Sequence, residues 1–417
     1  KASSGLDRLA ALGVDVRVGH SADQVGEAAV VTRSTAVPDS NPECRAALKR
    51  GIRLCGRPEV LGAISALRHT IAVAGTHGKT TTASMLALVL REAGLRPSFI
   101  IGGDVNEIGT GAAWDEGDLL VVEADESDGS FLELSARFGL VTNLEPDHLE
   151  HHGGFDPLLE AFDRFVEAVD GPVVVGVDDE EGAALAARHG TATVGTSAGS
   201  DWRLSEVVES WEGVRFTLTG PVTGAFGLEL PVPGLHNARN AASAAAVAVL
   251  AGAAPEAVVS ARGRFGGVAR RFEHRGQAAG VVLVDDYAHL PTEVGAVLAT
   301  ARSGGFARVV AVFQPNRFSR TEALWSSFGG AFDDADVLYV TDVYPSGEAP
   351  RPGVSGRLVA DAVLRDRPGA DVRYVARRED LLDALVGELR DGDLCLTMGA
   401  GDLTAVPDQL RARLGAS

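Results

Sequence analysis

The chain has 417 residues, 45% of them hydrophobic and 23% charged, and its formal net charge is -19 at pH 7. This length predicts about two to four domains, and the negative charge disfavours nucleic acid or an anionic membrane as a partner, because either would need a basic face. An anionic substrate would need a local positive site, which makes basic residues in clefts informative.

The cysteines and the lengths of the apolar runs bear on the cellular location of the protein. Cys44, Cys55 and Cys395 have no metal-binding spacing and are typical of reduced thiols. No apolar run approaches the roughly 18 residues of a membrane span, and no signal peptide is recognisable. We therefore expect a cytoplasmic protein without membrane insertion.

The first segment, residues 1–66, alternates short helical and strand patterns in the manner of an α/β domain. It is small for a free-standing α/β domain. The sequence also begins within a predicted helix, SGLDRLAALG, and has no initiator Met. We expect the start of this domain to be missing from the sequence.

The second segment, residues 67–266, contains four predicted strands that are almost continuously apolar: TIAVAG, DLLVVEAD, FGLVTN and GPVVVGV. Such runs favour a parallel sheet buried on both faces. Residues 191–232 are less regular and predict an antiparallel excursion. An Ala-rich helix, NARNAASAAAVAVLAG, closes the segment.

The third segment, residues 267–417, again alternates strands with helices. Its predicted strands are VVLVDD, ARVVAVFQ, ADVLYVTD, DVRYV and GDLCLTMG. Polar residues follow several of these strands, and ligands of open parallel sheets bind at the carboxyl ends of the strands. This segment therefore predicts a second binding edge.

A phosphate-binding loop is predicted between TIAVAG and the helix TTTASMLALVL. The general pattern has a glycine where this chain has Val73, and the nearest glycine is Gly75. Gly75 and Gly78 allow a tight turn, and the helix N-terminus favours an anion. Lys79, the only lysine beyond residue 49, could neutralise phosphate, and the Thr80 hydroxyl could bind Mg²⁺. The alternative is a glycine turn with a chance lysine.

Acidic residues at the next strand ends are candidates for the carboxylates that Mg²⁺ takes beside phosphate. Glu123 ends one strand, and Asp125, Glu126 and Asp128 follow it. The alternative for some of these is a solvated loop. After the following strand come Asp147 and His148, and the histidine could be a metal ligand or a helix cap.

The third segment carries basic residues suited to a carboxylate. Arg317 and Arg320 are three apart, so they are expected on one helical face, where paired arginines can hold a carboxylate. The alternative is two solvated arginines. Asp286, Tyr287 and His289 follow another strand, and the pair 270–271 lies at the segment boundary. ATP facing a carboxylate-binding domain suggests a ligase, while a kinase or a simple ATPase stays open.

Together these stretches resemble the Mur ligase family, most of all its alanine-adding members. The similar stretches run in family order and cover nearly the whole chain from residue 30: AVAGTHGKTTT, VVEADESDGSFL, VTNLEPDHLEHH, GLHNARNAASA, FGGVARRFE, VDDYAHLPTEV, FQPNRFSRT, TDVYPSGEAP and TMGAGD. One such stretch would be weak, but nine in order are specific.

The resemblance implies an α/β fold with three domains. These are a truncated N-terminal Rossmann-like domain that binds the UDP substrate (1–66), a central P-loop ATPase domain (67–266) and a C-terminal Rossmann-like domain that binds the amino acid (267–417). It also implies ATP-dependent ligation of L-alanine to UDP-N-acetylmuramate through an acyl phosphate, with Mg²⁺, in peptidoglycan synthesis. We expect a monomer or homodimer.

The resemblance also implies roles for single residues. Lys79, Glu123 and His148 would be catalytic, and Thr80, Glu123 and His148 would bind metal. The amino acid would be held by Tyr287, His289, Arg317 and Arg320. Nucleotide would be bound by Gly75, Thr76, His77, Gly78, Lys79, Thr80, Thr81, His236, Asn237, Asn240, Arg271 and Asp286.

Departures from the family pattern and rival interpretations accompany this resemblance. The family's N-terminal glycine-rich loop for the UDP diphosphate is absent from this sequence. The carbamoylated lysine of many members is absent too, which the alanine-adding members share. One rival is a murein-peptide-recycling ligase that joins a tripeptide to UDP-N-acetylmuramate. The other is a non-catalytic nucleotide-binding protein.

Arg317→Ala should raise the KM for alanine far more than the KM for ATP, because the guanidinium is expected to hold the carboxylate of the amino acid. Steady-state kinetics with each substrate varied in turn measures both constants. Equal changes in the two KM values would contradict the carboxylate clamp.

Overall fold

A computed structural model describes residues 4–34, 37–105, 108–127, 129–147, 152–261, 265 and 267–415, apart from the side chains of Ser4 and Asp104. The chain divides into two compact units. One comprises Lys1–Arg68 with Glu133–Ser135, and the other comprises His69–Leu132 with Ala136–Ser417. In the part of the chain described, no helix combines the length and apolarity needed to cross a membrane.

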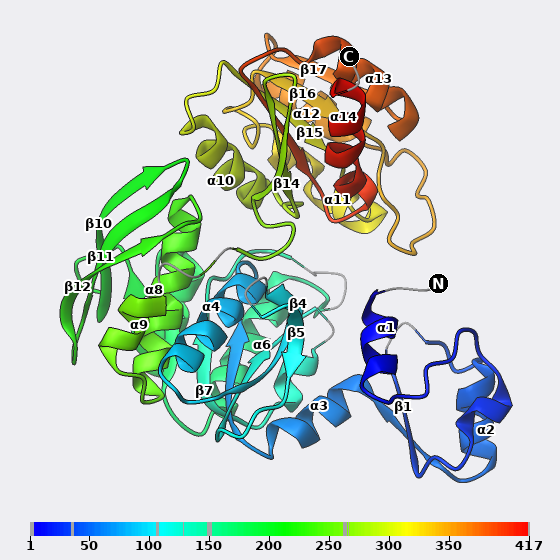
Figure 1. Cartoon of the computed structure of the whole chain (residues 1–417), viewed down its shortest axis with the longest axis vertical. Helices are drawn as coiled ribbons and strands as arrows, with labels where there is room; N and C mark the ends of the chain where they lie inside the picture. Colours follow the sequence, from blue (N-terminus) through cyan, green and yellow to red (C-terminus); the bar gives the residue numbers. More distant parts are fainter. Residues whose placement is uncertain are drawn as a thin grey trace. The chain divides into compact units, whose positions relative to one another are not determined.

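The first unit (blue in Figure 1) is a small α/β arrangement, as the alternating pattern predicted. Strands β1 and β2 pair in parallel. Helix α2 begins where the Asn41 side chain accepts a hydrogen bond from the Glu43 amide, with Pro42 at its first position. The elements are α1 (Ser4–Ala11), η1 (Ala22–Val25), β1 (Val30–Arg33), α2 (Pro42–Lys49), β2 (Arg53–Gly56) and α3 (Arg57–Ser65).

The second unit contains a ten-stranded central sheet in the order β12-β11-β10-β9-β8-β7-β3-β6-β4-β5. From β10 to β4 every neighbouring pair is parallel. The predicted apolar strands form its buried centre. Its strands are β3 (His69–Ala74), β4 (Ser98–Val105), β5 (Thr110–Ala113), β6 (Leu119–Glu123), β7 (Ala136–Val141), β8 (Val173–Gly176), β9 (Ala192–Gly195), β10 (Trp202–Ser210), β11 (Gly213–Gly220) and β12 (Gly224–Leu230).

The predicted antiparallel excursion is confirmed, although it starts later than residue 191. Strand β9 still pairs in parallel with β8, and the antiparallel pairs of this stretch are β10–β11 and β11–β12. At the other edge of the sheet β4 and β5 also pair antiparallel. The helices packed on this sheet include α4 and the Ala-rich α8, whose small buried side chains let the two helices pack closely. The helical elements are α4 (Lys79–Glu92), η2 (Ser130–Glu133), α6 (Phe155–Ala168), α7 (Glu180–His189), α8 (Leu235–Leu250) and α9 (Pro255–Ala261).

The C-terminal sheet has six strands in the order β13-β14-β18-β15-β16-β17. All its pairs are parallel except β13–β14. The sequence did not predict β13, because its residues EHRGQA are mostly polar. The strands are β13 (Glu273–Ala278), β14 (Val281–Asp286), β15 (Arg308–Phe313), β16 (Val337–Val340), β17 (Asp371–Tyr374) and β18 (Asp393–Met398).

Helices lie on both faces of this second sheet, which gives the doubly covered parallel arrangement that the apolar strands predicted. They are α10 (Pro291–Arg302), α11 (Phe318–Leu324), η3 (Trp325–Phe328), α12 (Arg357–Asp366), α13 (Arg378–Glu388), η4 (Asp402–Ala405) and α14 (Val406–Leu414). The predicted domain boundaries at residues 66 and 266 stay a prediction.

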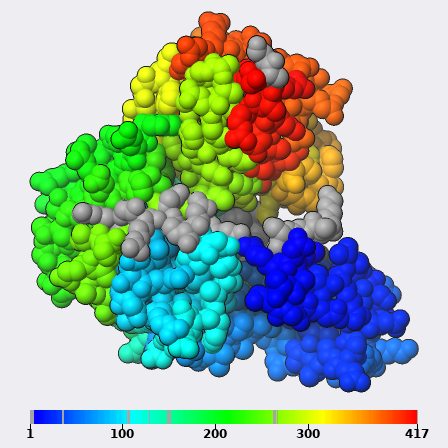
Figure 2. Space-filling view, in the orientation of Figure 1, coloured from blue at the N-terminus to red at the C-terminus, as the bar shows by residue number. Residues whose placement is uncertain are grey.

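An aromatic contact joins the two sheets of the second unit. Trp211, in the turn between β10 and β11, meets Phe306 edge-on with ring centroids 4.6 Å apart and Phe272 with centroids 5.5 Å apart. Figure 2 shows the green surface of β10–β12 against the yellow-green surface that follows it in the chain. Edge-to-face rings add stabilisation beyond the apolar area that they bury.

Trp211→Ala should lower the free energy of unfolding by ~2 kcal/mol, because the indole is partly buried and both ring contacts are lost. Trp211→Phe keeps an aromatic ring and should cost about half as much. Denaturant unfolding of the three proteins measures this. An unchanged midpoint for Trp211→Ala would contradict the role of the contact.

Candidate functional site

The predicted phosphate loop joins β3, which ends at Ala74, to α4, which begins at Lys79. Gly75 has φ of 121° and Gly78 has φ of 77°. A Cβ on Gly75 would lie 2.1 Å from Thr142 Oγ1, and one on Gly78 would lie 2.4 Å from Asn240 Oδ1. Both conformation and space therefore require glycine here. The loop is packed against the end of β7 on one side and α8 on the other.

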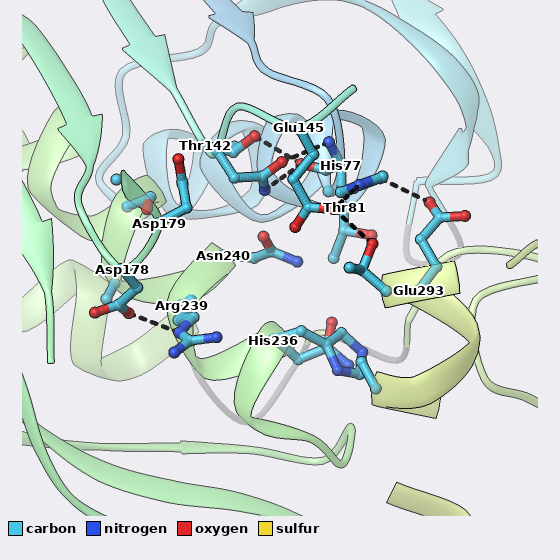
Figure 3. A pocket seen from close by; sticks show the side chains of 18 of the residues that line it. His77, Thr81, Thr142, Glu145, Asp178, Asp179, His236, Arg239, Asn240 and Glu293 are labelled. Carbon is cyan, nitrogen blue, oxygen red and sulfur yellow. Dashed lines mark hydrogen bonds and ion pairs between the residues drawn. The ribbon is translucent and has the colours of Figure 1, made fainter. Parts of the chain in front are cut away.

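A cavity of about 280 Å³ opens beside this loop (Figure 3). Its walls come from the phosphate loop, the ends of β7 to β9, the start of α8 and the start of α10. Predicted nucleotide-binding residues in the lining are His77, Gly78, Thr81, His236, Asn237, Asn240, Arg271 and Asp286. Residues that sequence reasoning did not assign also line it, among them Glu145, Asp178, Asp179, Arg239, Thr292 and Glu293.

His77 lies between two carboxylates (Figure 3). Its Nε2 is 3.2 Å from Glu145 Oε2, and its Nδ1 is 3.1 Å from Glu293 Oε1. Burial disfavours the charged imidazole, but the hydrogen bonds that it donates to the Glu145 and Glu293 carboxylates, with their negative charges, outweigh this cost and raise the pKa of His77 to about 9. A largely buried, positively charged histidine thus lies in the wall of the cavity.

Lys79 is paired inside the protein rather than extended into the cavity. Its Nζ is 2.8 Å from Glu126 Oε2 and donates to the carbonyl oxygens of Gly75 (2.7 Å) and Thr76 (3.2 Å). Burial raises the pKa of Glu126 to about 7, although Lys79 opposes this. The Lys79 ammonium is therefore held at the loop by Glu126, one of the several acidic residues that follow β6 and were candidates for a magnesium site.

Thr80 and Glu123 form a second polar pair at this sheet edge. Thr80 Oγ1 donates to Glu123 Oε1 at 2.9 Å, and the Gly102 amide donates to Glu123 Oε2 at 2.7 Å. The two predicted metal ligands are thus adjacent. The third, His148, lies outside the described residues. Among the residues described, three or more His, Cys, Asp or Glu side chains nowhere gather in a metal-binding cluster.

The opposite wall is formed by buried groups near Arg271. Burial lowers the pKa of His236 to about 4, helped by the charge of Arg271, so its imidazole is neutral. Burial raises the pKa of Asp286 to about 6, although Arg271 and two backbone amides oppose this. Those amides belong to Phe272 and Ala288, at 2.7 and 2.6 Å. Arg271 thus brings positive charge to this wall, next to the Asp286 carboxyl, which a pKa of about 6 leaves mostly ionised at neutral pH.

The segment around Arg271 is anchored by its neighbour. Arg270, with φ of 61°, donates through Nη2 to the Gly399 carbonyl at 2.6 Å. Both guanidiniums lie over the Tyr287 ring, that of Arg270 at 4.9 Å and that of Arg271 at 5.1 Å from the ring centroid. A guanidinium over an aromatic face is attracted to it. The contacts of Arg270 therefore fix the segment before β13, in which the next residue, Arg271, lines the cavity.

The predicted amino-acid residues lie outside the cavity lining, and one expectation about them is wrong. Arg317 and Arg320 do not share a helical face, because α11 begins at Phe318 and Arg317 precedes it with φ of 64°. Arg320 is buried and binds the Asp147 carboxylate, with Nε and Nη2 at 3.1 and 3.0 Å from Oδ1. It therefore holds a carboxylate of the protein here, while its role toward an amino acid stays a prediction.

Tyr287 and His289 are adjacent in space, with ring centroids 5.5 Å apart and edge-on. Burial lowers the pKa of His289 to about 4, although Glu293 opposes this. The His289 Nδ1 lies 3.0 Å from the Tyr287 carbonyl oxygen. The loop 287–290 is thereby folded on itself at the end of β14.

The acids that sequence reasoning did not assign carried only weak signals. Glu145 follows strand β7 and Glu293 lies in the first turn of α10, a position where glutamate often caps a helix. Neither position alone predicts that both acids meet His77. Glu126 was one of several acids after β6, and only the structure distinguishes it.

Comparison with known proteins gives one family. The model of the Mur ligase family, catalytic domain, matches residues 1–69, that of the Mur ligase middle domain matches residues 73–248, and that of the Mur ligase glutamate ligase domain matches residues 270–401. The UDP-N-acetylmuramate–L-alanine ligase of Kineococcus radiotolerans is 46% identical over 415 residues, which cover 97% of this chain and 87% of the relative. That of Thermobifida fusca is 41% identical over 427 residues, covering 99% and 90%.

Solved structures that are similar to this chain include ligases of the same kind. The UDP-N-acetylmuramate–alanine ligase of Thermotoga maritima aligns with a TM-score of 0.82 at 28% identity, over 98% of this chain and 90% of that one. A murein peptide ligase of Psychrobacter arcticus aligns with a TM-score of 0.70 at 23% identity, over 99% and 91%. At that identity the second likeness concerns the fold alone.

His77 should stabilise the folded state in a pH-dependent way. Its pKa rises from 6.5 to about 9 on folding, so its stabilisation is complete below pH ~6.5 and is lost as the pH rises through ~9, on the order of 3 kcal/mol in total. The difference in free energy of unfolding between the wild type and His77→Gln should therefore shrink between these pH values. A difference that stays constant over this window would show that His77 is not charged.

Proposed function

Because this chain belongs to the Mur ligase family, we propose that it uses ATP to join L-alanine to UDP-N-acetylmuramate, in peptidoglycan precursor synthesis. The observation that carries this proposal is the identity of 41% and 46%, over nearly the whole chain, with relatives named for that reaction. A cytoplasmic location and a monomeric or dimeric state stay predictions.

The recycling ligase is the less favoured alternative. The alanine ligase of Thermotoga maritima aligns with a higher TM-score and a higher identity than the murein peptide ligase does. A non-catalytic nucleotide-binding protein is also less favoured, because the paired basic and acidic groups beside the phosphate loop would have no reaction to serve.

The cavity beside the phosphate loop supports ATP as a substrate. Gly75 and Gly78 bring backbone amides close to where phosphates would lie, at the N-terminus of α4. Arg271 adds positive charge from the C-terminal sheet, and neutral His236 faces it. When ATP binds, the Lys79 ammonium would leave its ion pair with Glu126 and pair with phosphate oxygens instead.

Thr80 and Glu123 fit a magnesium ion. Mg²⁺ prefers oxygen ligands, usually one or two carboxylates beside phosphate and water. The Thr80 hydroxyl and the Glu123 carboxylate are adjacent oxygens at the end of β6. A metal ion there would stabilise charge on the phosphates. Thr80 and Glu123 would hold it, and the proposed part of His148 rests on the family resemblance.

The chain's own residues would also bring together two anions. The muramoyl carboxylate and ATP repel each other, so the positive groups at the loop must offset that repulsion before an acyl phosphate can form. The amine of alanine then displaces phosphate. Acyl phosphates hydrolyse easily, so closure of the two sheets of the second unit over the site would exclude water.

Phosphate release by the purified chain with ATP, Mg²⁺ and UDP-N-acetylmuramate should depend on added L-alanine. The alanine-dependent rate should fall to background in Lys79→Ala, because the phosphates lose their buried countercharge. Release with the tripeptide but not with alanine would favour the recycling ligase. Release with neither amine would contradict a ligase.

A further inference from the structure

The Glu293 carboxylate joins two segments that come from different sheets. Its Oε1 lies 3.1 Å from Nδ1 of His77 in the phosphate loop. Its Oε2 accepts hydrogen bonds from the backbone amides of His289 at 2.9 Å and Leu290 at 3.2 Å. Figure 3 shows His77 and Glu293 pointing toward one another across the wall of the cavity.

A helix cap alone does not account for this arrangement. Glutamate at the third position of a helix commonly accepts from the amide before the helix, and one oxygen suffices for that. Here the second oxygen of Glu293 turns to the other sheet, and the side chain is only 13% exposed. Burying a carboxylate this deeply is costly unless its partners compensate.

Glu145 supports the same connection from the other side of His77. Its Oε2 lies 3.2 Å from His77 Nε2 and accepts from the Thr292 hydroxyl at 2.6 Å. The first turn of α10 therefore reaches the phosphate loop twice, through Glu293 directly and through Thr292 by way of Glu145. Any shift of α10 away from the loop would break both connections.

We propose that Glu293 is a positioning residue that couples the phosphate loop to the amino-acid loop 287–290. This inference rests on the proposed function and on the expectation, drawn from the family resemblance, that Tyr287 and His289 hold the amino acid. The orientation of that loop is set through the two amides that Glu293 holds, and the position of Glu293 is set by His77. A displacement of about 1 Å at a reacting group can cost two orders of magnitude in rate, so the link serves to place the amine for attack.

Glu293→Gln separates coupling from capping. The amide oxygen of glutamine can still accept from the amides of His289 and Leu290, while its NH₂ group cannot accept from a protonated His77. The KM for alanine at saturating ATP should rise about tenfold or more, the loss expected for a charged hydrogen bond, and should rise more than the KM for ATP. Glu293→Asp keeps the charge but is one methylene shorter, so it should also raise the KM for alanine.

A double-mutant cycle tests the path through His77. His77→Gln alone should raise the KM for alanine, and His77→Gln with Glu293→Gln should raise it no further than the larger single effect. Glu388→Gln is the matched control. Glu388 is a mostly buried carboxylate at the end of α13 that is not part of the cavity lining, and it accepts hydrogen bonds from Arg308 at 2.6 Å and from Arg373 at 2.7 Å. It should lower stability and leave the KM for alanine unchanged.

The outcomes separate the two proposals. A wild type without alanine-dependent phosphate release would overturn the proposed function and this inference with it. An active wild type whose KM for alanine is unmoved by Glu293→Gln, or additive effects of the two substitutions, would overturn the coupling alone. A similar rise in Glu388→Gln would show a general effect of instability and would also overturn it.

Discussion

Buried charge at the carboxyl end of β3 is the constraint on which the site depends. A charged group removed from water is costly unless an opposite charge or hydrogen bonds compensate it. Three basic side chains described near this edge are paired with acids. Lys79 has Glu126, His77 has Glu145 and Glu293, and Arg320 has Asp147. The positive groups that an anionic substrate needs are thereby kept charged within a protein of strongly negative net charge.

Two of these pairs cross from one sheet to the other. His77 and Asp147 belong to the central sheet's loops, whereas Glu293 and Arg320 follow strands of the C-terminal sheet. Together with the Trp211 contact they define how the walls of the cavity meet. The proposed reaction must bring ATP, a carboxylate and an amine together. The contacts between the two sheets would therefore help to assemble the site, in addition to stabilising the fold.

The sequence predicted the fold well because long apolar strands and an Ala-rich helix dominate it. Strand β13 was missed because its residues are mostly polar. Strand β9 was predicted to belong to the antiparallel excursion, but it pairs in parallel with β8, because the sequence of a single strand does not show which strand it pairs with. The tight turn at Gly75 and Gly78 was predictable, because glycine adopts positive φ easily and has no Cβ to collide with Thr142 and Asn240.

The partners of the charged residues were much harder to predict. Glu145 and Glu293 lie 148 positions apart in the chain and meet only at His77, so no local pattern reveals them. The helical spacing of Arg317 and Arg320 misled because Arg317 takes a left-handed conformation before the helix begins. The roles of the predicted site residues toward ATP and alanine stay predictions, and His148 lies outside the described residues.

The most direct test of the account follows oxygen from one substrate into one product. UDP-N-acetylmuramate labelled with oxygen-18 in its carboxylate would be incubated with the chain, ATP, Mg²⁺ and L-alanine, and the released phosphate would be analysed by mass spectrometry. Activation as an acyl phosphate predicts that each phosphate carries one labelled oxygen, because the carboxylate oxygen leaves with it. Unlabelled phosphate, released at the same rate, would contradict the account.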